Sequence, residues 1–265
     1  MKKFDCITFF QENFITNIRF EILKDVVDFF VVCESRYDHR GNKKEINFQL
    51  LNSDLKKKVR HVILDHPFPE GLNLWQRQAY QREFIFNGIK DCEDDDYIMF
   101  SDPDEIPNPE VLKNFILKKK YAIFHQKCFN YKLNLLNPHE TPWSGTRLTK
   151  KKYLLSFDFF RQKILEKNIN KWWKFSVERN IEIVKDGGWH FNNLFSPKMI
   201  SKKLKTFAHD EFSGEEYSDE KVIEEKIYKG IDLFNRGQKL KKVDIDNTYP
   251  RYILNKIKEF KEFIV

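Results

Sequence analysis

Residues 95–109 read Asp-Asp-Tyr-Ile-Met-Phe-Ser-Asp-Pro-Asp-Glu-Ile-Pro-Asn-Pro, a short apolar segment between acidic ones. The apolar part runs from Tyr97 to Phe100, and such a run flanked by acids is typical of a buried strand in a parallel sheet. Asp102 and Asp104 follow at once, so both are predicted at the carboxyl end of this strand. Ligands of open α/β sheets bind at that edge.

The spacing of the two acids indicates a metal site. Pro103 favours extended geometry at Asp102, and side chains two residues apart in an extended chain point the same way. Two carboxylates on one side suit Mg²⁺ or Mn²⁺ carrying a diphosphate. An acidic surface turn is the alternative interpretation of the same residues.

The segments around this stretch predict the fold class. Apolar runs at 4–10, 26–33 and 59–64 read as strands, and residues 14–24 and 74–90 read as helices between them. This alternation predicts an α/β protein with a mostly parallel central sheet flanked by helices. Further along the chain we expect helices near 109–119, 197–207, 220–234 and 252–263, strands within 121–136, 153–160 and 181–184, and a turn at 185–188.

Composition, net charge and cysteine spacing limit the classes of protein to which the sequence can belong. The 265 residues carry a net charge of +7, which favours anionic partners in general, and 26 Phe residues predict a Phe-rich core. Four separated Cys residues without a CxxC pair indicate neither a disulfide framework nor a zinc site. The sequence shows neither a signal peptide nor an apolar run of bilayer length, which predicts a cytoplasmic protein and leaves only peripheral membrane contact open.

Arg82 lies on the apolar stripe of the expected helix 74–90, together with Trp75 and Ile85. A buried guanidinium needs a partner. An internal ion pair with a sheet carboxylate and a contact with a nucleotide phosphate explain this position equally well.

Several motifs along the chain carry a family resemblance. In order they are Val31–Ser35 with Gly41, Leu64–His66 with Pro69, Tyr80 with Arg82, Asp102–Pro107, Ala122–His125, Gly188–His190 and Tyr249–Leu254. Together they resemble glycosyltransferase family 17, which includes the bisecting N-acetylglucosaminyltransferases. The resemblance covers nearly the whole chain from about residue 5.

The resemblance implies a GT-A type nucleotide-sugar-binding fold, a UDP-sugar donor, most simply UDP-GlcNAc, and Mn²⁺ or Mg²⁺ as the cofactor. It also implies transfer of the sugar to a glycan with inversion at the anomeric carbon. Without repeats or linkers, residues 1–265 are expected to form one domain. Its part up to about residue 117 would bind the nucleotide, and the part from about 118 would face the acceptor and close the site.

Within this resemblance, Asp104 is the expected metal ligand, and Asp102 is expected to contact the ribose or the metal. His190, in Gly-Gly-Trp-His-Phe, is the expected third ligand because imidazole is acceptable to Mn²⁺ and paired glycines allow close backbone approach. His209 is the competing candidate for the metal ligand. A histidine buried in the core is the alternative interpretation of His190, and the paired glycines and the retained Gly-Trp-His motif argue against it.

Four further residues are expected to contact the nucleotide. Glu34, at the end of a strand, could accept the N3–H hydrogen bond of uracil. Arg161, Lys203 and Lys205 are expected to contact phosphates. Surface acids and solvated basic helix faces are the alternative explanations.

An inverting transfer needs a carboxylate that takes the proton of the attacking hydroxyl group. Glu211 is the expected base and Asp210 is its alternative. Trp143, Trp172 and Trp173 are candidates for stacking on sugar rings, with core packing as the alternative.

Three other functions compete with this one. The same fold could use another UDP-sugar on a bacterial or viral surface glycan. A basic nucleic-acid-binding module is the second alternative, but the acids gather where phosphates would have to bind, so nucleic acid is not an expected partner. A carbohydrate-binding protein without catalysis is the third, and the presence of both Asp102 and Asp104 argues against it.

Overall fold

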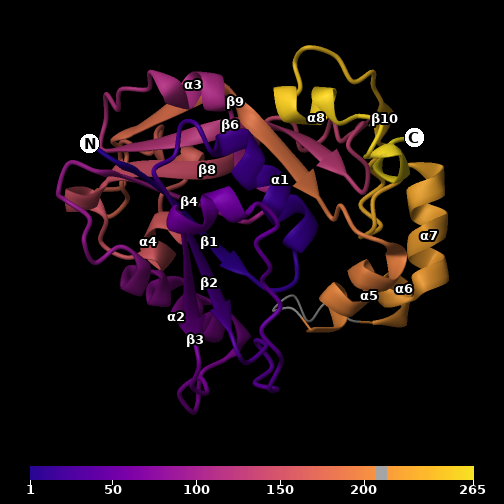
Figure 1. Ribbon diagram of the computed structural model, residues 1–265, viewed down its shortest axis with the longest axis horizontal. Helices are drawn as coiled ribbons and strands as arrows, with labels where there is room; N and C mark the ends of the chain where they lie inside the picture. The colour runs from indigo at the N-terminus through magenta and orange to yellow at the C-terminus, as the bar shows by residue number, and fades with distance from the viewer. Residues whose placement is uncertain (207–213) are drawn as a thin grey trace.

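The computed structural model describes residues 1–206 and 214–265, and Figure 1 shows a central sheet with helices on both faces. The first part of the sheet is parallel, with strands in the order β3-β2-β1-β4. These strands are β1 (Lys3–Phe9), β2 (Phe29–Ser35), β3 (Val59–Leu64) and β4 (Tyr97–Ser101). The crossovers between them contain α1 (Asn13–Leu23), η1 (Ser53–Lys57), α2 (Leu74–Phe84) and η2 (Ile85–Gly88).

The second part of the sheet is mixed. Strand β8 (Trp143–Lys150) pairs antiparallel with β4, β6 (Tyr121–Asn130) pairs antiparallel with β8, and β9 (Ile181–Asn192) runs parallel to β6. The short strand β5 (Glu105–Pro107) is antiparallel to β9, and β7 (Leu135–Leu136) links β6 to β10 (Lys241–Lys242). The predicted α/β class, with a sheet flanked by helices, is confirmed.

The remaining helices are short and lie mostly in the second half of the chain. They are α3 (Pro109–Lys113), η3 (Lys151–Tyr153), α4 (Phe157–Gln162), η4 (Glu166–Asn168), α5 (Pro197–Thr206), α6 (Glu215–Ser218), α7 (Glu220–Lys229), α8 (Arg251–Asn255) and η6 (Lys261–Phe263). In Figure 1, α5, α6 and α7 form a group beyond the end of β9.

Two predicted segments were wrong, and two predicted helices were too long. Residues 153–160 form no strand but lead into α4, because Ser156 caps the helix and Phe157 and Phe160 are buried at helical spacing. The predicted turn at 185–188 lies inside β9, at an irregularity where the register with β6 shifts. The predicted helices 109–119 and 252–263 are shorter, since α3 ends at Lys113 and α8 at Asn255.

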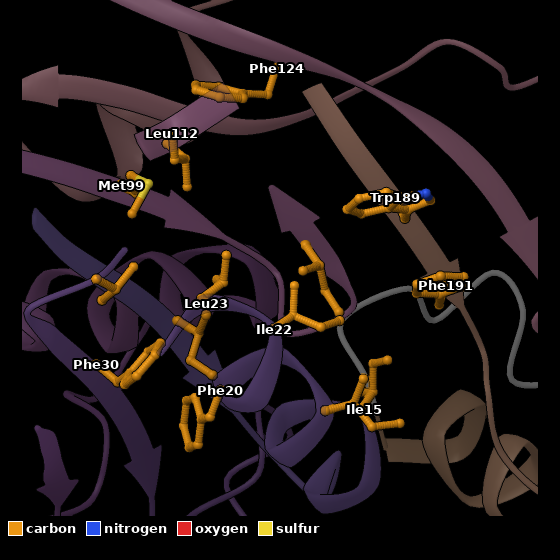
Figure 2. Packing of buried hydrophobic residues seen from close by; sticks show 14 of the residues in the cluster. Ile15, Phe20, Ile22, Leu23, Phe30, Met99, Leu112, Phe124, Trp189 and Phe191 are labelled. Carbon is orange, nitrogen blue, oxygen red and sulfur yellow. The ribbon is translucent and has the colours of Figure 1, made fainter. Parts of the chain in front are cut away.

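The core lies on both faces of the sheet and is rich in Phe, as expected. On one face α1 packs its apolar side, including Ile15, Ile22 and Leu23, toward the sheet, and Figure 2 shows these side chains together with Trp189 and Phe191 from β9. On the other face, α2 and α4 cover a second cluster. The two layers hold the carboxyl ends of β1, β2 and β4 in place.

None of the helices in the described part of the chain combines the length and the apolar character that a bilayer-spanning segment requires.

Candidate functional site

The site begins where β4 ends. Residues 102–105 form a hydrogen-bonded turn, in which the Glu105 N–H donates to the Asp102 carbonyl at 3.0 Å. The Asp102 N–H donates back to Glu105 Oε2 at 3.2 Å. The chain thus turns at Pro103 and Asp104 instead of continuing extended through both acids, and Asp102 and Asp104 both line one cavity of about 420 Å³.

This cavity lies at the carboxyl edge of the parallel strands. Its wall combines the ends of β1 and β2, the turn after β4, the end of β9 and one side of α5. Five of the predicted site residues line it together, namely Asp102, Asp104, Arg161, His190 and Lys203. Trp143 also lines it, whereas Trp172 and Trp173 do not.

Asp104 and His190 form the buried centre of the site. The register of β5 and β9 sets Glu105 opposite His190, which brings His190 Nε2 to 3.5 Å from Asp104 Oδ1. Burial alone raises the pKa of Asp104, but the charge and hydrogen bond of His190, aided by Lys203, outweigh burial and lower it. Burial likewise lowers the pKa of His190, and Asp104 and Cys128 more than reverse this effect and raise it.

Glu105 organises the other side of the turn. Its fully buried carboxylate accepts hydrogen bonds from both terminal nitrogens of Arg161, each at 2.9 Å, and from the Trp143 indole at 2.8 Å. The Trp143 ring in turn packs on the His190 ring with centroids 4.8 Å apart. Arg161 also binds Asp102 at 2.6 Å, so in this structure its guanidinium is directed at two carboxylates. Its predicted phosphate contact stays a prediction.

Arg19 holds the Asp102–Glu105 turn in place through buried hydrogen bonds, and it was not among the predicted site residues. Its side chain is fully buried, pairs with Asp5 at 2.6 and 2.7 Å, and donates to the Glu105 carbonyl at 2.6 Å and to Ser101 Oγ at 2.7 Å. The signal was present, because Arg19 lies on the same helical stripe as Ile15 and Ile22, and Asp5 interrupts an apolar strand.

The two predicted lysines differ in position. Lys203 reaches the cavity from α5, where its Nζ lies 3.2 Å from Asn193 Oδ1. Lys205 lies on the exposed side of the same helix and does not line the cavity. The geometry is therefore compatible with a phosphate contact for Lys203 in the cavity, but it does not support one for Lys205.

Arg82 lies outside the cavity wall. It pairs with Asp158 at 2.8 Å and with Gln78 Oε1 at 2.8 Å, and Gln78 does line the cavity. Of the two explanations weighed for Arg82, the structure shows the internal ion pair, with a partner on α4 rather than on the sheet. The direct nucleotide contact stays a prediction.

Glu34 is fully buried and has four donors within the protein. These are Lys44 Nζ at 2.8 Å, the backbone N–H groups of Asn47 and Phe48 at 2.7 and 3.1 Å, and the His61 ring at 3.2 Å. A carboxylate offers about four acceptor positions. In this structure Glu34 thus anchors the loop that follows β2, and its carboxylate has no acceptor position left for a further donor. The predicted contact of Glu34 with uracil stays a prediction.

The neighbouring end of the cavity offers other polar groups for a nucleoside. Ser35, Tyr37 and His39 line it from the loop after β2. The Gln81 amide donates to the Cys33 carbonyl at 3.1 Å and faces the His39 ring with its oxygen at 3.0 Å. Burial lowers the pKa of His39 to about 4, so the imidazole is neutral near pH 7.

The predicted base, Glu211, its alternative Asp210, and the competing metal ligand His209 all lie outside the described residues.

The residues of this site fit a divalent metal ion as part of a complex with substrate. In residues 1–206 and 214–265 no group of three or more His, Cys, Asp or Glu side chains lies close enough to hold an ion alone. Asp104 and His190 offer one oxygen and one nitrogen on the cavity wall. Mg²⁺ and related ions at nucleotide sites commonly use one or two protein ligands and complete their shell with phosphate oxygens and water.

Comparison with known proteins gives a family match. The sequence model of glycosyltransferase family 17 matches residues 1–237. A human beta-1,4-mannosyl-glycoprotein 4-beta-N-acetylglucosaminyltransferase is 34% identical over 104 residues, which are 35% of this chain and 19% of that protein. The rat and mouse proteins of the same name match at 34% and 33% over the same shares. The match thus spans about a fifth of the length of these relatives.

Solved structures show remote similarity. Glucosyl-3-phosphoglycerate synthase from Mycobacterium tuberculosis, solved with Mn²⁺ and UDP, aligns with a TM-score of 0.35 at 13% identity and covers 71% of this chain and 70% of its own. A glycosyltransferase involved in glycosylation of the major capsid of PBCV-1 aligns with a TM-score of 0.30 at 12% identity, over 70% and 82%.

Proposed function

The chain belongs to glycosyltransferase family 17, and from this premise we propose that it transfers a sugar from a UDP-sugar to a hydroxyl group of a glycan. The predicted family and the predicted α/β class are confirmed. The GT-A type of the fold and the transferase activity are part of the proposal. Donor sugar, acceptor, metal dependence and catalytic residues belong to the proposal.

One observation carries the proposal. The buried Asp104–His190 pair lies 3.5 Å apart on the wall of a cavity that Lys203 and Asp102 also line, at the carboxyl edge of parallel strands. Carboxylate, imidazole and ammonium groups at such an edge are suited to a metal-bound diphosphate. Asp104 and His190 are the proposed metal ligands, and Lys203 is the proposed phosphate contact.

A divalent ion held there would neutralise the negative charge that develops on the departing diphosphate. The protein residues have separate tasks. Glu105, through Arg161 and Trp143, fixes the turn and the His190 ring. The nucleoside is proposed to occupy the end of the cavity near Ser35 and His39.

The proposed chemical step is a direct displacement. The acceptor oxygen attacks the anomeric carbon, the bond from that carbon to the phosphate oxygen breaks, and UDP leaves with the electron pair. Attack opposite the leaving group inverts the anomeric centre. The hydroxyl proton passes to a carboxylate, for which Glu211 is proposed and Asp210 is the alternative.

The proposed donor is UDP-GlcNAc, because the curated relatives are named as N-acetylglucosaminyltransferases. Another UDP-sugar on a bacterial or viral surface glycan is the alternative. A donor screen by UDP release separates them: UDP-GlcNAc should turn over faster than UDP-Glc and UDP-Gal. Preference for another UDP-sugar would reject the GlcNAc assignment while leaving the transferase assignment intact.

The site itself is tested by ligand-dependent stability. UDP with Mn²⁺ at about one hundred times its Kd should raise the melting temperature by about 5 °C, because a ligand that binds only the folded state stabilises it. Asp104→Asn keeps the side-chain shape and should remove the Mn²⁺-dependent part of this shift. Asp244→Asn, a matched change at an exposed position, should keep the full shift.

Two outcomes would reject the proposal for this site. One is the absence of any shift with UDP and Mn²⁺ in the wild-type protein. The other is an Asp104→Asn variant that responds to Mn²⁺ as the wild type does.

A further inference from the structure

Residues 171–175 read Lys-Trp-Trp-Lys-Phe, and their aromatic side chains project into solvent. Trp172, Trp173 and Phe175 are 75%, 56% and 92% exposed. Three large aromatic side chains exposed within four residues are unusual, because large apolar groups on a surface usually mark a contact with a partner or membrane. The proposed transferase site does not explain them.

The loop is supported at its base by hydrogen bonds. The Lys171 N–H donates to the Asn168 carbonyl, the Lys174 N–H donates to the Lys171 carbonyl, both at 3.0 Å, and Arg179 Nη1 donates to the Trp172 carbonyl at 2.8 Å. Glu178 accepts from the N–H groups of Arg179 and Asn180 and pairs with Lys120 at 3.1 Å. These hydrogen bonds hold the base of the loop, while the side chains of Trp172, Trp173 and Phe175 are exposed.

Strand register places the start of β9 far from the candidate site. β9 begins at Ile181, which pairs with Tyr121 at the start of β6, whereas His190 pairs with Cys128 farther along. The start of β6 lies beside the end of β8, and Lys150 there pairs with Tyr97 at the amino end of β4. The loop is thus attached at the opposite edge of the sheet from the cavity, so its aromatic residues cannot stack on a sugar held beside Asp104.

Lysines surround this edge. Lys171 and Lys174 alternate with the aromatic residues of the loop, Lys118–Lys120 precede β6, Lys150 ends β8, and Lys151 and Lys152 follow it. Part of this charge is paired, since Lys150 and Lys152 both contact Asp95 and Lys120 contacts Glu178. The loop residues 171–175 contain no acid, and residues 163–179 as a whole carry four Lys and one Arg against Glu166 and Glu178. The loop and its flanking residues therefore have a net positive charge, which is complementary to an anionic surface.

We propose that residues 171–175 form a contact site for an anionic phospholipid membrane. Trp side chains favour the interface between lipid headgroups and acyl chains, and neighbouring lysines attract anionic headgroups. A glycan-stacking site fits less well, because the Trp172 and Trp173 rings lie at 89° to each other and no acid or amide side chain in the loop is available to bind sugar hydroxyl groups. Membrane contact at this edge would leave the cavity at the opposite edge open to a glycan acceptor.

The test is sedimentation of the full chain with vesicles. Vesicles of phosphatidylcholine with about one third phosphatidylserine should bind the wild-type protein, and binding should weaken as salt screens the lysines. The variants Trp172→Ser/Trp173→Ser/Phe175→Ser and Lys171→Glu/Lys174→Glu should each lower the partition coefficient at least about tenfold. Binding should also shift the tryptophan emission of the wild type to shorter wavelength.

Matched controls are available elsewhere on the surface. Tyr228→Ser removes an exposed aromatic group from α7, and Lys241→Glu/Lys242→Glu makes the same charge change on the exposed strand β10. Both should bind anionic vesicles as the wild type does, and unchanged melting temperatures should show that every variant is folded. Failure of the wild type to bind, loop variants that bind normally, or wild-type binding through this loop to a free oligosaccharide but not to vesicles would overturn the proposal.

Discussion

Arg19 is the residue on which the geometry of the Asp102–Glu105 turn depends most directly. It is fully buried, and its guanidinium links Asp5 in β1 to the carbonyl of Glu105 and to Ser101 at the end of β4. Since Asp104 sits within this turn, Arg19 is a positioning residue: it acts on the metal site through the backbone and does not itself line the cavity.

We expect Arg19→Met to lower the free energy of unfolding by about 3–5 kcal/mol, because Asp5 would be left as a buried charge without its partner. The variant should also weaken Mn²⁺-dependent binding of UDP. Urea unfolding measures the first effect, and calorimetric titration with UDP and Mn²⁺ measures the second.

The double variant Asp5→Leu/Arg19→Met separates the two roles. It should recover part of the stability, because no unpaired charge remains, but UDP binding should stay weak since the turn has lost its donors. Full recovery of UDP binding in the double variant would show that Arg19 only neutralises Asp5.

His39 should make stability depend on pH. Burial lowers its pKa to about 4, while an unfolded histidine titrates near 6.5. As the pH falls below about 6.5, the His39 side chain of the unfolded chain binds a proton before that of the folded protein does. The contribution of His39 to the free energy of unfolding is therefore fully present above that pH and is lower by about 3 kcal/mol at pH 4.

The measurement is the slope of unfolding free energy against pH between about 6.5 and 4. His39→Gln should reduce this slope by one proton. Equal slopes for the wild type and His39→Gln would contradict a neutral, buried His39.

At the scale of elements, strand β9 sets the position of His190 in the site. It runs between β5 and β6, and its register brings His190 next to Asp104 and Cys128. The Lys185–Gly188 segment was predicted as a turn because it combines polar residues with two glycines. In the structure that segment is a bulge within the strand, where Gly188 adopts φ +143 and the pairing with β6 shifts.

Gly188→Ala should destabilise the fold by about 3 kcal/mol or more, because the substitution combines a clash with backbone strain. A Cβ atom there would lie 2.1 Å from the Ile106 carbonyl oxygen in β5. The His190–Asp104 contact should loosen with it, so chemical denaturation and Mn²⁺-dependent UDP binding should change together.

Gly237→Ala is the matched control for this change. Gly237 also has positive φ, at +70, but a Cβ atom there would meet no heavy atom within 4 Å. Gly237→Ala should lower the free energy of unfolding by about 1–2 kcal/mol, because of backbone conformation alone, and UDP binding should not change. Equal effects of the two substitutions would show that contact with β5 is unimportant.

At the scale of the whole molecule, the site is assembled from segments that are distant in sequence. Asp5, Arg19, Glu105, Arg161 and His190 contribute to one connected set of contacts around the turn after β4. The C-terminal segment returns to the same half of the fold, where Phe263 stacks on Phe14 of α1 with centroids 4.3 Å apart. Loss of packing at any one of these segments would therefore affect the others.

Much of the architecture was predictable because it is encoded locally. Alternating apolar runs indicated the strands β1 to β4 and the helices between them, and an acidic pair after an apolar run indicated the ligand edge of the sheet. The segment from β8 to α4 was not predictable in this way. Its Phe-rich helix resembles a strand in composition, and only Ser156 as cap and the sheet beneath it decide its conformation.

The sequence by itself determined the α/β class, the family and the position of Asp102 and Asp104 after a strand, because these follow from patterns within a few neighbouring residues and from shared motifs. Only the tertiary structure decided which groups face each other: Arg161 with Glu105, Arg82 with Asp158, Glu34 with its own loop, and His190 with Asp104. The physical reason is that a side chain's partner depends on strand register and helix packing between segments separated by tens of residues, and no local pattern encodes those distances.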